Sequence, residues 1–149
     1  MTDTLFQFVL PANLSSSLSL TGLIWFVQIV HYPLFAKVGA REFVGYEKNH
    51  SRLTSLVVGP PMLVEAAAAV GLLFARQEWL PSWTVWTGVG LVVVIWLSTA
   101  AIQIPSHTRL EAGFETAVHR RLVISNWIRT LAWTLRTWIA LFLVWRSRY

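Results

Sequence analysis

The chain has no cysteine and few charged side chains for its length. The absence of cysteine excludes disulfides, thiolate metal sites and cysteine nucleophiles. Charged residues make up 13% of the 149 positions, against about 25% in an average soluble protein. The sequence also lacks a phosphate-binding loop, a GxSxG motif and a Rossmann fingerprint. These absences leave no sequence support for nucleotide chemistry or for serine hydrolysis of the α/β type.

What the sequence has in excess is apolar residues, which account for 55% of it. A single bilayer crossing needs about 20 predominantly apolar residues in a helix. Four segments meet this need, and we predict one all-α, polytopic membrane domain over residues 1–149. Its architecture is expected to be an antiparallel bundle of four transmembrane helices, with spans at about residues 16–38, 53–75, 84–104 and 122–145.

The shorter segments carry further expectations. Residues 5–10 are too short to span, and Pro11 is expected to end them, so that they lie at the interface or pack on the bundle. Pro33 predicts a kink or break near the end of the first span, because proline lacks an amide donor. Residues 107–121 are apolar at helical spacing and polar elsewhere, which predicts a short interfacial amphipathic helix between spans three and four.

The basic residues predict an orientation. Because they cluster in loops between spans, a nucleic-acid partner is not expected. The N-terminus lacks a basic leader and a clear cleavage site, which is typical of mature sequence. We therefore expect a protein of the bacterial inner membrane, with loops one and three in the cytoplasm and both termini outside. Seven basic residues lie in those two loops (Lys37, Arg41, Lys48, Arg52, Arg109, Arg120 and Arg121) and three on the opposite side (Arg76, Arg146 and Arg148).

The fourth span carries charges that the other helices must satisfy. Asn126, Arg129, Trp133 and Arg136 recur at steps of three, four and three, which places them on one helical face. An arginine near the bilayer centre costs at least roughly 2.5–3.5 kcal/mol on insertion scales. Two such residues on one helix therefore need partners, water or a ligand.

Depth along the helices offers one partner. At about 1.5 Å per residue, Glu65 and Arg136 lie within about 2 and 4 Å of the centres of their spans. Opposite charge at matching depth predicts a structural ion pair, since pairing is the usual fate of membrane charges. The functional alternative is a proton or anion site in which Glu65 titrates.

The remaining polar groups extend from the midplane toward the cytoplasmic side, whereas the outer halves of the spans are almost purely apolar. This asymmetry favours a polar pocket that opens inward, and it disfavours a transport pathway across the membrane. His31 lies within the first span, at about the depth of Arg129. It could be a structural histidine bonded to a neighbouring helix, or a contact to a metal, a haem or a quinone.

Three residues near the cytoplasmic boundary are candidate metal ligands. Glu47 and His50 have the i, i+3 spacing found in carboxylate di-iron sites, although a complete site needs a second copy that the chain lacks. His107 is expected at the same depth as His50. We predict that His50, His107 and Glu47 hold any metal, while the alternative is a solvated loop. A haem held by His31 and His107 is disfavoured, because their depths differ by about 14 Å, and His119 is expected at the surface.

Four short motifs carry a resemblance to small bacterial four-span membrane proteins. They are His31-Tyr32-Pro33-Leu34-Phe35, Phe43-x-x-Tyr46-x-x-x-His50, Pro61-Met62-x-x-Glu65 and Asn126-Trp127-x-Arg129-Thr130. Over about residues 18–145 the chain also distantly resembles the anthrone-oxygenase-like domain of unknown function, which shares four spans and an Asn-x-x-Arg near the start of the last. Characterised fungal members oxidise anthrones to anthraquinones without an identified cofactor. The resemblance implies that His31, Asn126 and Arg129 would carry such an activity here.

Together these observations lead to a functional hypothesis: a membrane redox or oxygenase-like enzyme with an inward-facing polar site. Arg129 and Asn126 would stabilise negative charge on an enolate or phenolate oxygen, and His31 would move the proton. A metal ion or haem could serve as cofactor, and a quinone or aromatic molecule as ligand. The alternative is a non-catalytic accessory subunit of a larger membrane complex, whose buried charges serve assembly with other subunits. Contacts to a bound cofactor are assigned to Gln28, Gln103 and Trp133.

Overall fold

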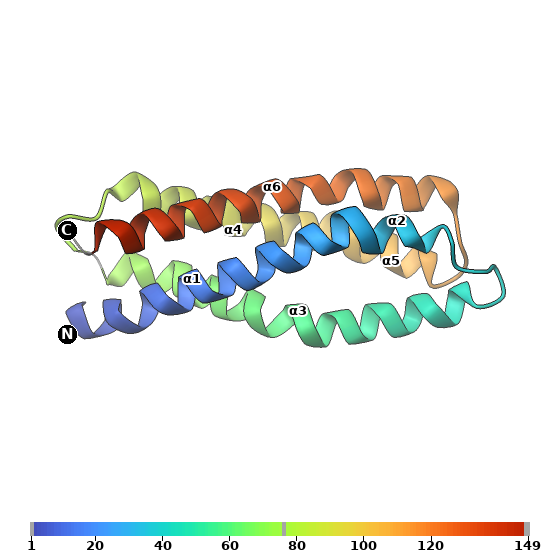
Figure 1. The fold of residues 1–149 in the computed structure, drawn as a ribbon, viewed down its shortest axis with the longest axis horizontal. Helices are drawn as coiled ribbons and strands as arrows, with labels where there is room; N and C mark the ends of the chain where they lie inside the picture. Colours follow the sequence, from blue (N-terminus) through green and yellow to red (C-terminus); the bar gives the residue numbers. More distant parts are fainter. Residues whose placement is uncertain (1, 76, 148–149) are drawn as a thin grey trace.

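The computed structural model describes residues 2–75 and 77–147, which are mostly helical and contain no strand. Four long helical segments lie side by side along one axis (Figure 1). The first and third each contain a short π-helical stretch, here called η1 and η2. The segments are α1 (Thr2–Phe26), η1 (Val27–His31) and α2 (Tyr32–Phe35); α3 (Phe43–Phe74); α4 (Ser82–Ser98), η2 (Thr99–Gln103) and α5 (Ile104–Leu110); and α6 (Thr116–Arg146).

Successive segments run in opposite directions. The two ends of the chain lie at one end of the bundle, and the α2–α3 and α5–α6 connections lie at the other (Figure 1). Around the bundle, α1 packs on α3 and α6, and α4 packs on α6. The contact between α3 and α4 is the sparsest of the four. The bundle is therefore closed tightly on three sides and loosely on one.

Within the described residues, three helices are long and apolar enough to cross a membrane: Thr4–Phe35, Phe43–Phe74 and Ser82–Leu110. The fourth helix, α6, has 31 residues and is also long enough. The arginines and the asparagine of α6 lower its mean hydropathy, and α6 is not among the helices that are apolar enough to cross a membrane. Composition thus indicates a helical membrane protein with three candidate spans. Length and composition alone do not support the predicted fourth span at residues 122–145.

Large apolar side chains cover much of the exterior, and polar and charged side chains share the interior with an apolar core. Large apolar residues such as Phe8, Leu56 and Trp138 are exposed on the outside of the helices. Polar side chains are buried between them, among them Asn13, Ser17, Gln28, Glu47, Glu65 and Arg136. Soluble monomers rarely expose apolar surface this continuously, whereas a protein in lipid does.

The N-terminal segment differs from the prediction. Pro11 does not end it, because α1 runs unbroken from Thr2 through Pro11. Proline's fixed φ is compatible with a helix, and its missing donor leaves only one backbone bond unmade. Phe6 and Leu10 are buried, and the ring of Phe6 meets Trp79 edge-on at 5.4 Å. The packing of these side chains holds the segment as part of the first helix.

A π-helical stretch precedes a proline in two places. The η1 stretch ends two residues before Pro33, and η2 ends two residues before Pro105. A proline ring clashes with the carbonyl one turn earlier in an α-helix, and a wider π turn separates the two groups. The kink expected at Pro33 therefore takes the form of a widened turn, and the helix continues to Phe35.

The predicted interfacial helix over residues 107–121 is wrong. Its first part ends α5 at Leu110, and its last part begins α6 at Thr116. Gly113 between them has a φ of +153°, which side chains rarely adopt, so the chain turns there. Leu110, Val118 and Leu122 are buried in the bundle core rather than at a bilayer surface.

The connections carry the charges that predict orientation. The α2–α3 connection contains Lys37 and Arg41, and basic residues also begin α6. Arg76 and Arg148, which count toward the opposite side, lie outside the described residues.

Candidate functional site

Glu65 and Arg136 form an ion pair at the centre of the bundle. Arg136 Nε lies 2.7 Å from Glu65 Oε1, and the two side chains are 3% and 0% exposed respectively. Ser17 Oγ donates to the same carboxylate oxygen at 3.0 Å, and Trp133 Nε1 donates to Oε2 at 2.9 Å. Both oxygens of this buried carboxylate are therefore occupied.

The guanidinium of Arg136 is equally satisfied. Its Nη1 donates to the Gly88 carbonyl oxygen at 2.6 Å, and its Nη2 donates to Asn13 Oδ1 at 2.7 Å. These bonds connect all four helical segments. A charged network with every group paired is a structural element, and the predicted cofactor contact Trp133 belongs to it rather than to a cavity.

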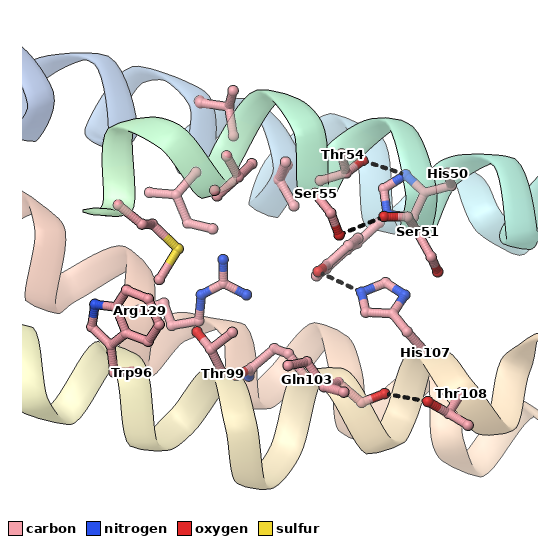
Figure 2. A pocket seen from close by; sticks show the side chains of 18 of the residues that line it. His50, Ser51, Thr54, Ser55, Trp96, Thr99, Gln103, His107, Thr108 and Arg129 are labelled. Carbon is pink, nitrogen blue, oxygen red and sulfur yellow. Dashed lines mark hydrogen bonds between the residues drawn. The ribbon is translucent and has the colours of Figure 1, made fainter. Parts of the chain in front are cut away.

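Arg129, two turns earlier on α6, is in a different situation. It is 7% exposed, its Nε has no hydrogen-bond partner, and it takes part in no ion pair among the described residues. Its guanidinium lies 5.0 Å from the centre of the Trp133 ring, a cation–π contact. Figure 2 shows it pointing into a cavity beside Trp96 and Thr99. A buried cation without a carboxylate partner is costly unless something else neutralises it.

The cavity next to Arg129 has a volume of about 470 Å³ and lies between α3 and the α4–η2–α5 segment. Its lining combines apolar side chains, among them Ile24 and Met62, with polar ones. Figure 2 shows Trp96 beside Arg129 at one end and His50 with His107 at the other. Small-molecule sites typically occupy about 300–1,000 Å³ and combine apolar walls with a few polar groups. The cavity fits that description.

A chain of three polar side chains reaches this cavity. The Tyr32 hydroxyl lies 3.0 Å from His107 Nε2, and His107 Nδ1 lies 2.5 Å from Glu47 Oε1. Glu47 is fully buried, and its Oε2 has no partner. A carboxylate at Nδ1 favours the tautomer with the proton there, which leaves Nε2 to accept the Tyr32 hydroxyl hydrogen. Tyr32 and His107 both line the cavity.

His31 contacts His50, a residue of α3. Its Nε2 is 2.8 Å from His50 Nδ1, which also lies 3.1 Å from Thr54 Oγ1. His31 lines a second cavity of about 520 Å³ between the first helix and α3, and His50 and Thr54 line both cavities. His31 therefore does not share a cavity with Arg129, although the sequence places both in one site.

Asn126 and Gln28 are buried and bonded to each other. Asn126 Nδ2 donates to Gln28 Oε1 at 2.9 Å, and Gln28 Nε2 donates to the Val123 carbonyl at 3.2 Å. These bonds join η1 to α6, and neither residue lines the cavity next to Arg129. Gln103 does line it, while bonding Ser98 and Ser125.

The predicted site residues thus divide among several places. His31, Asn126 and Arg129 do not come together, and only Gln103 of the three expected cofactor contacts reaches the cavity. Sequence reasoning missed Tyr32, Trp96 and Thr99 as cavity residues. Tyr32 could have been found from its position one helical turn after Gln28, which points it to the same interior face.

The predicted metal site is not supported by the geometry. The rings of His50 and His107 lie 5.2 Å apart, yet no three His, Cys, Asp or Glu side chains in the described part of the chain could hold a metal ion. Both nitrogens of His107 bond to Glu47 and Tyr32, and His50 Nδ1 bonds to His31 and Thr54. The donors expected to bind a metal or a haem are hydrogen-bonded to one another instead.

His119 is not simply a surface histidine. Its Nε2 donates to the Tyr32 carbonyl oxygen at 2.7 Å, and its ring stacks on Phe35 at 6.2 Å. It therefore helps to fix the short α2 segment that carries Tyr32.

Comparison with protein-family models, with curated proteins and with solved structures finds no match for this chain. The resemblance to the anthrone-oxygenase-like family accordingly stays a prediction from the sequence.

Proposed function

We propose that this protein is a membrane enzyme of the oxygenase-like class that removes a proton from a lipid-soluble aromatic or enolic molecule. The observation that carries the proposal is the arrangement in one cavity of Arg129, whose Nε is unpaired, with the Tyr32–His107–Glu47 chain. Tyr32 also interacts electrostatically with Arg129. The cavity thus offers a cation for a negative oxygen and, next to that cation, a path for its proton.

The proposal includes a fourth span. Asn126, Arg129 and Arg136, the strongly polar residues in the middle of α6, are buried. The outward side chains Ile124, Leu131 and Trp138 are exposed and apolar. Because an arginine that faces the bundle interior does not contact lipid, α6 can cross the bilayer with its polar face toward the other helices. The result is an antiparallel four-span bundle. The charge bias favours a bacterial inner membrane with the α2–α3 and α5–α6 connections in the cytoplasm.

Proton removal follows from the hydrogen bonds. The substrate's acidic hydrogen approaches the Tyr32 oxygen, while the Tyr32 hydroxyl proton moves to His107 Nε2. The imidazolium that forms is stabilised by the Glu47 carboxylate at Nδ1. The net change is that the substrate becomes an anion and His107 carries its proton.

Arg129 stabilises that anion. The guanidinium lies over the Trp133 ring and beside a cavity with mostly apolar walls, where electrostatic interactions are stronger than in water. Loss of one preorganised donor to an oxyanion typically costs about 2.7–4 kcal/mol in the barrier. Arg129 takes the role predicted from the sequence, while Tyr32 and His107 take the proton-moving role predicted for His31.

The oxidative step rests on the family resemblance. An anthrone-type anion reacts with dioxygen so that a ring CH₂ group becomes a carbonyl. One oxygen atom of dioxygen enters the product, and the other leaves as water with the two displaced hydrogens. The chain's own residues supply the deprotonation and the binding of the anion.

Absorbance of a bound naphthol tests the proposal. We expect the naphtholate band to appear when 2-naphthol is added to the purified protein at a pH where free naphthol is neutral. Arg129→Gln should abolish the band, and the matched control Arg120→Gln, an exposed arginine on the same helix, should keep it. Absence of the band in the unsubstituted protein would refute the proposed acid–base site.

The second candidate function is a non-catalytic accessory subunit in a membrane complex. The fully paired Glu65–Arg136 network supports this candidate, because its buried charges join the helices of the bundle and are not available to a ligand. A protein that binds no acidic aromatic molecule, consumes no dioxygen with an anthrone and co-purifies with a stoichiometric membrane subunit would support this function instead.

A further inference from the structure

We infer that the cavity next to Arg129 takes its ligand sideways from the bilayer, through an opening between α3 and the α4–η2–α5 segment. The ligand is an amphipathic, membrane-dissolved molecule with an acidic oxygen. This inference rests on the proposed function for the chemistry of the ligand, but its route of entry is independent of that chemistry.

The first support is the packing around the opening. The α3–α4 contact is the sparsest in the bundle, and the cavity lies along it. Among the lining residues, Leu63 on α3 is 61% exposed and Ile104 at the start of α5 is 56% exposed. Apolar, exposed residues on both sides of an opening suit contact with acyl chains rather than with water.

The second support is Gly59 on α3. It lines the cavity, and a Cβ added there would meet no atom within 4 Å. A side chain at this position would therefore project into free space at the opening. Pro60 and Pro61 follow directly and remove two backbone donors from α3. The glycine keeps the opening clear, and the prolines weaken the helix beside it.

The third support is the position of the cation in the cavity. Arg129, the buried cation whose Nε has no partner, lies beside the aromatic ring of Trp96, whereas His50 and His107 lie at the other end (Figure 2). A ligand with an aromatic part and an acidic oxygen can place its ring against Trp96 and its oxygen against Arg129.

The second cavity does not compete for this ligand. It is of similar size, about 520 Å³, but its lining contains neither lysine nor arginine. Its polar side chains include His31, Tyr46 and Asn49. A neutral lining gives an acidic oxygen no charge to pair with.

Carbene footprinting in liposomes tests the route. A neutral aryl diazirine dissolved in the lipid is photolysed, and modified residues are located by mass spectrometry. We expect Met62 to be modified, although it is buried from the outer surface, because it lines the cavity. Ile95, which is fully buried and does not line the cavity, is the internal control and should stay unmodified.

A glycine pair supplies matched variants. Gly59→Leu should reduce the modification of Met62 to the level of Ile95, because the new side chain fills the opening. Gly90→Leu makes the same change on α4, where a Cβ is also free of contacts but outside the cavity lining, and should leave the modification of Met62 unchanged. Leucine favours helix over glycine, so neither change removes helical stability.

The outcomes separate the inference from the proposed function. Modification of Met62 that Gly59→Leu removes, in a protein that shows no naphtholate band, would support the lateral opening and refute the acid–base site. Modification of Met62 only by a water-soluble diazirine would overturn the lateral opening, even in a protein that binds naphthol. The comparison of Met62 with Ile95 in the unsubstituted protein decides the point without any variant.

Discussion

At the scale of single residues, two arginines on one face of α6 differ in their hydrogen-bond partners. Arg136 is bonded to Glu65, Asn13 and Gly88, so no part of it is available to a ligand. Arg129 has a ring contact and an unpaired Nε beside a cavity. The same residue type thus stabilises the bundle at one position and offers a binding site at another, and the difference lies in the partners that neighbouring helices supply.

The pairing of Glu65 with Arg136 gives the first prediction. Glu65→Gln or Arg136→Met alone should destabilise the protein by about 3–5 kcal/mol, because each leaves a buried charge without its partner. The double variant should lose less than the two single losses combined. Thermal or denaturant unfolding in detergent measures the coupling, and strictly additive losses would contradict a direct pair.

Depth along a helix was sufficient to predict this pair, but it was not sufficient for the cavity. It placed Glu65 and Arg136 at one level, and the two side chains form an ion pair. It also placed His31 and Arg129 at one level, yet they line different cavities. Depth gives the position along the bundle axis, whereas sharing a cavity also depends on the direction around it. Only the packing of the helices fixes that direction.

At the scale of elements, helix boundaries decide which residues reach the core. Hydrophobic spacing over residues 107–121 is consistent with an amphipathic helix, and it is equally consistent with two helices separated by a turn. Gly113 with its positive φ separates them. The π-helical stretches before Pro33 and Pro105 likewise widen the turns that precede Tyr32 and His107. Sequence identified the prolines but not the conformation that accommodates them.

The turn between α5 and α6 gives the second prediction. Gly113→Val should destabilise the protein by about 1–3 kcal/mol, because a β-branched residue is strained at a φ of +153°. Gly45→Ala, at a helical glycine on α3 with no atom near its Cβ, should be neutral or stabilising by about 0.5–1 kcal/mol. Unfolding curves of equal midpoint for Gly113→Val and the unsubstituted protein would rule out this account of the turn.

At the scale of the whole molecule, the bundle combines an apolar exterior with an apolar core that contains buried polar groups, and only some of these groups are fully hydrogen-bonded. The central network around Glu65 is complete, whereas four buried side-chain atoms of the described residues have no hydrogen-bond partner: Glu47 Oε2, Ser51 Oγ, Asn126 Oδ1 and Arg129 Nε. The four-helix arrangement follows from the apolar segments, and all-helical structure was predictable from composition. Whether α6 crosses the membrane depends on how the other helices cover its polar face, which its own sequence does not give.

Topology labelling tests that point, and the absence of native cysteine makes it simple. Single substitutions Glu78→Cys, Ala112→Cys and Ser147→Cys place one thiol at an exposed position in the α3–α4 connection, in the α5–α6 connection and after α6, respectively. We expect an impermeant maleimide to label positions 78 and 147 on intact spheroplasts, and position 112 only after the membrane is permeabilised. Positions 112 and 147 labelled from the same side would contradict a crossing by α6.

The most direct test of the central claim, that Arg129 binds an acidic oxygen in the cavity, compares two ligands of one shape. Equilibrium binding of 2-naphthol and its neutral methyl ether is measured for the unsubstituted protein and for Arg129→Gln. A hydrogen bond to a charged group contributes about 1.5–3 kcal/mol, so naphthol should bind roughly ten-fold or more tightly than the ether. Arg129→Gln should make the two affinities equal. Equal affinities in the unsubstituted protein, or a preference that survives the substitution, would contradict the account.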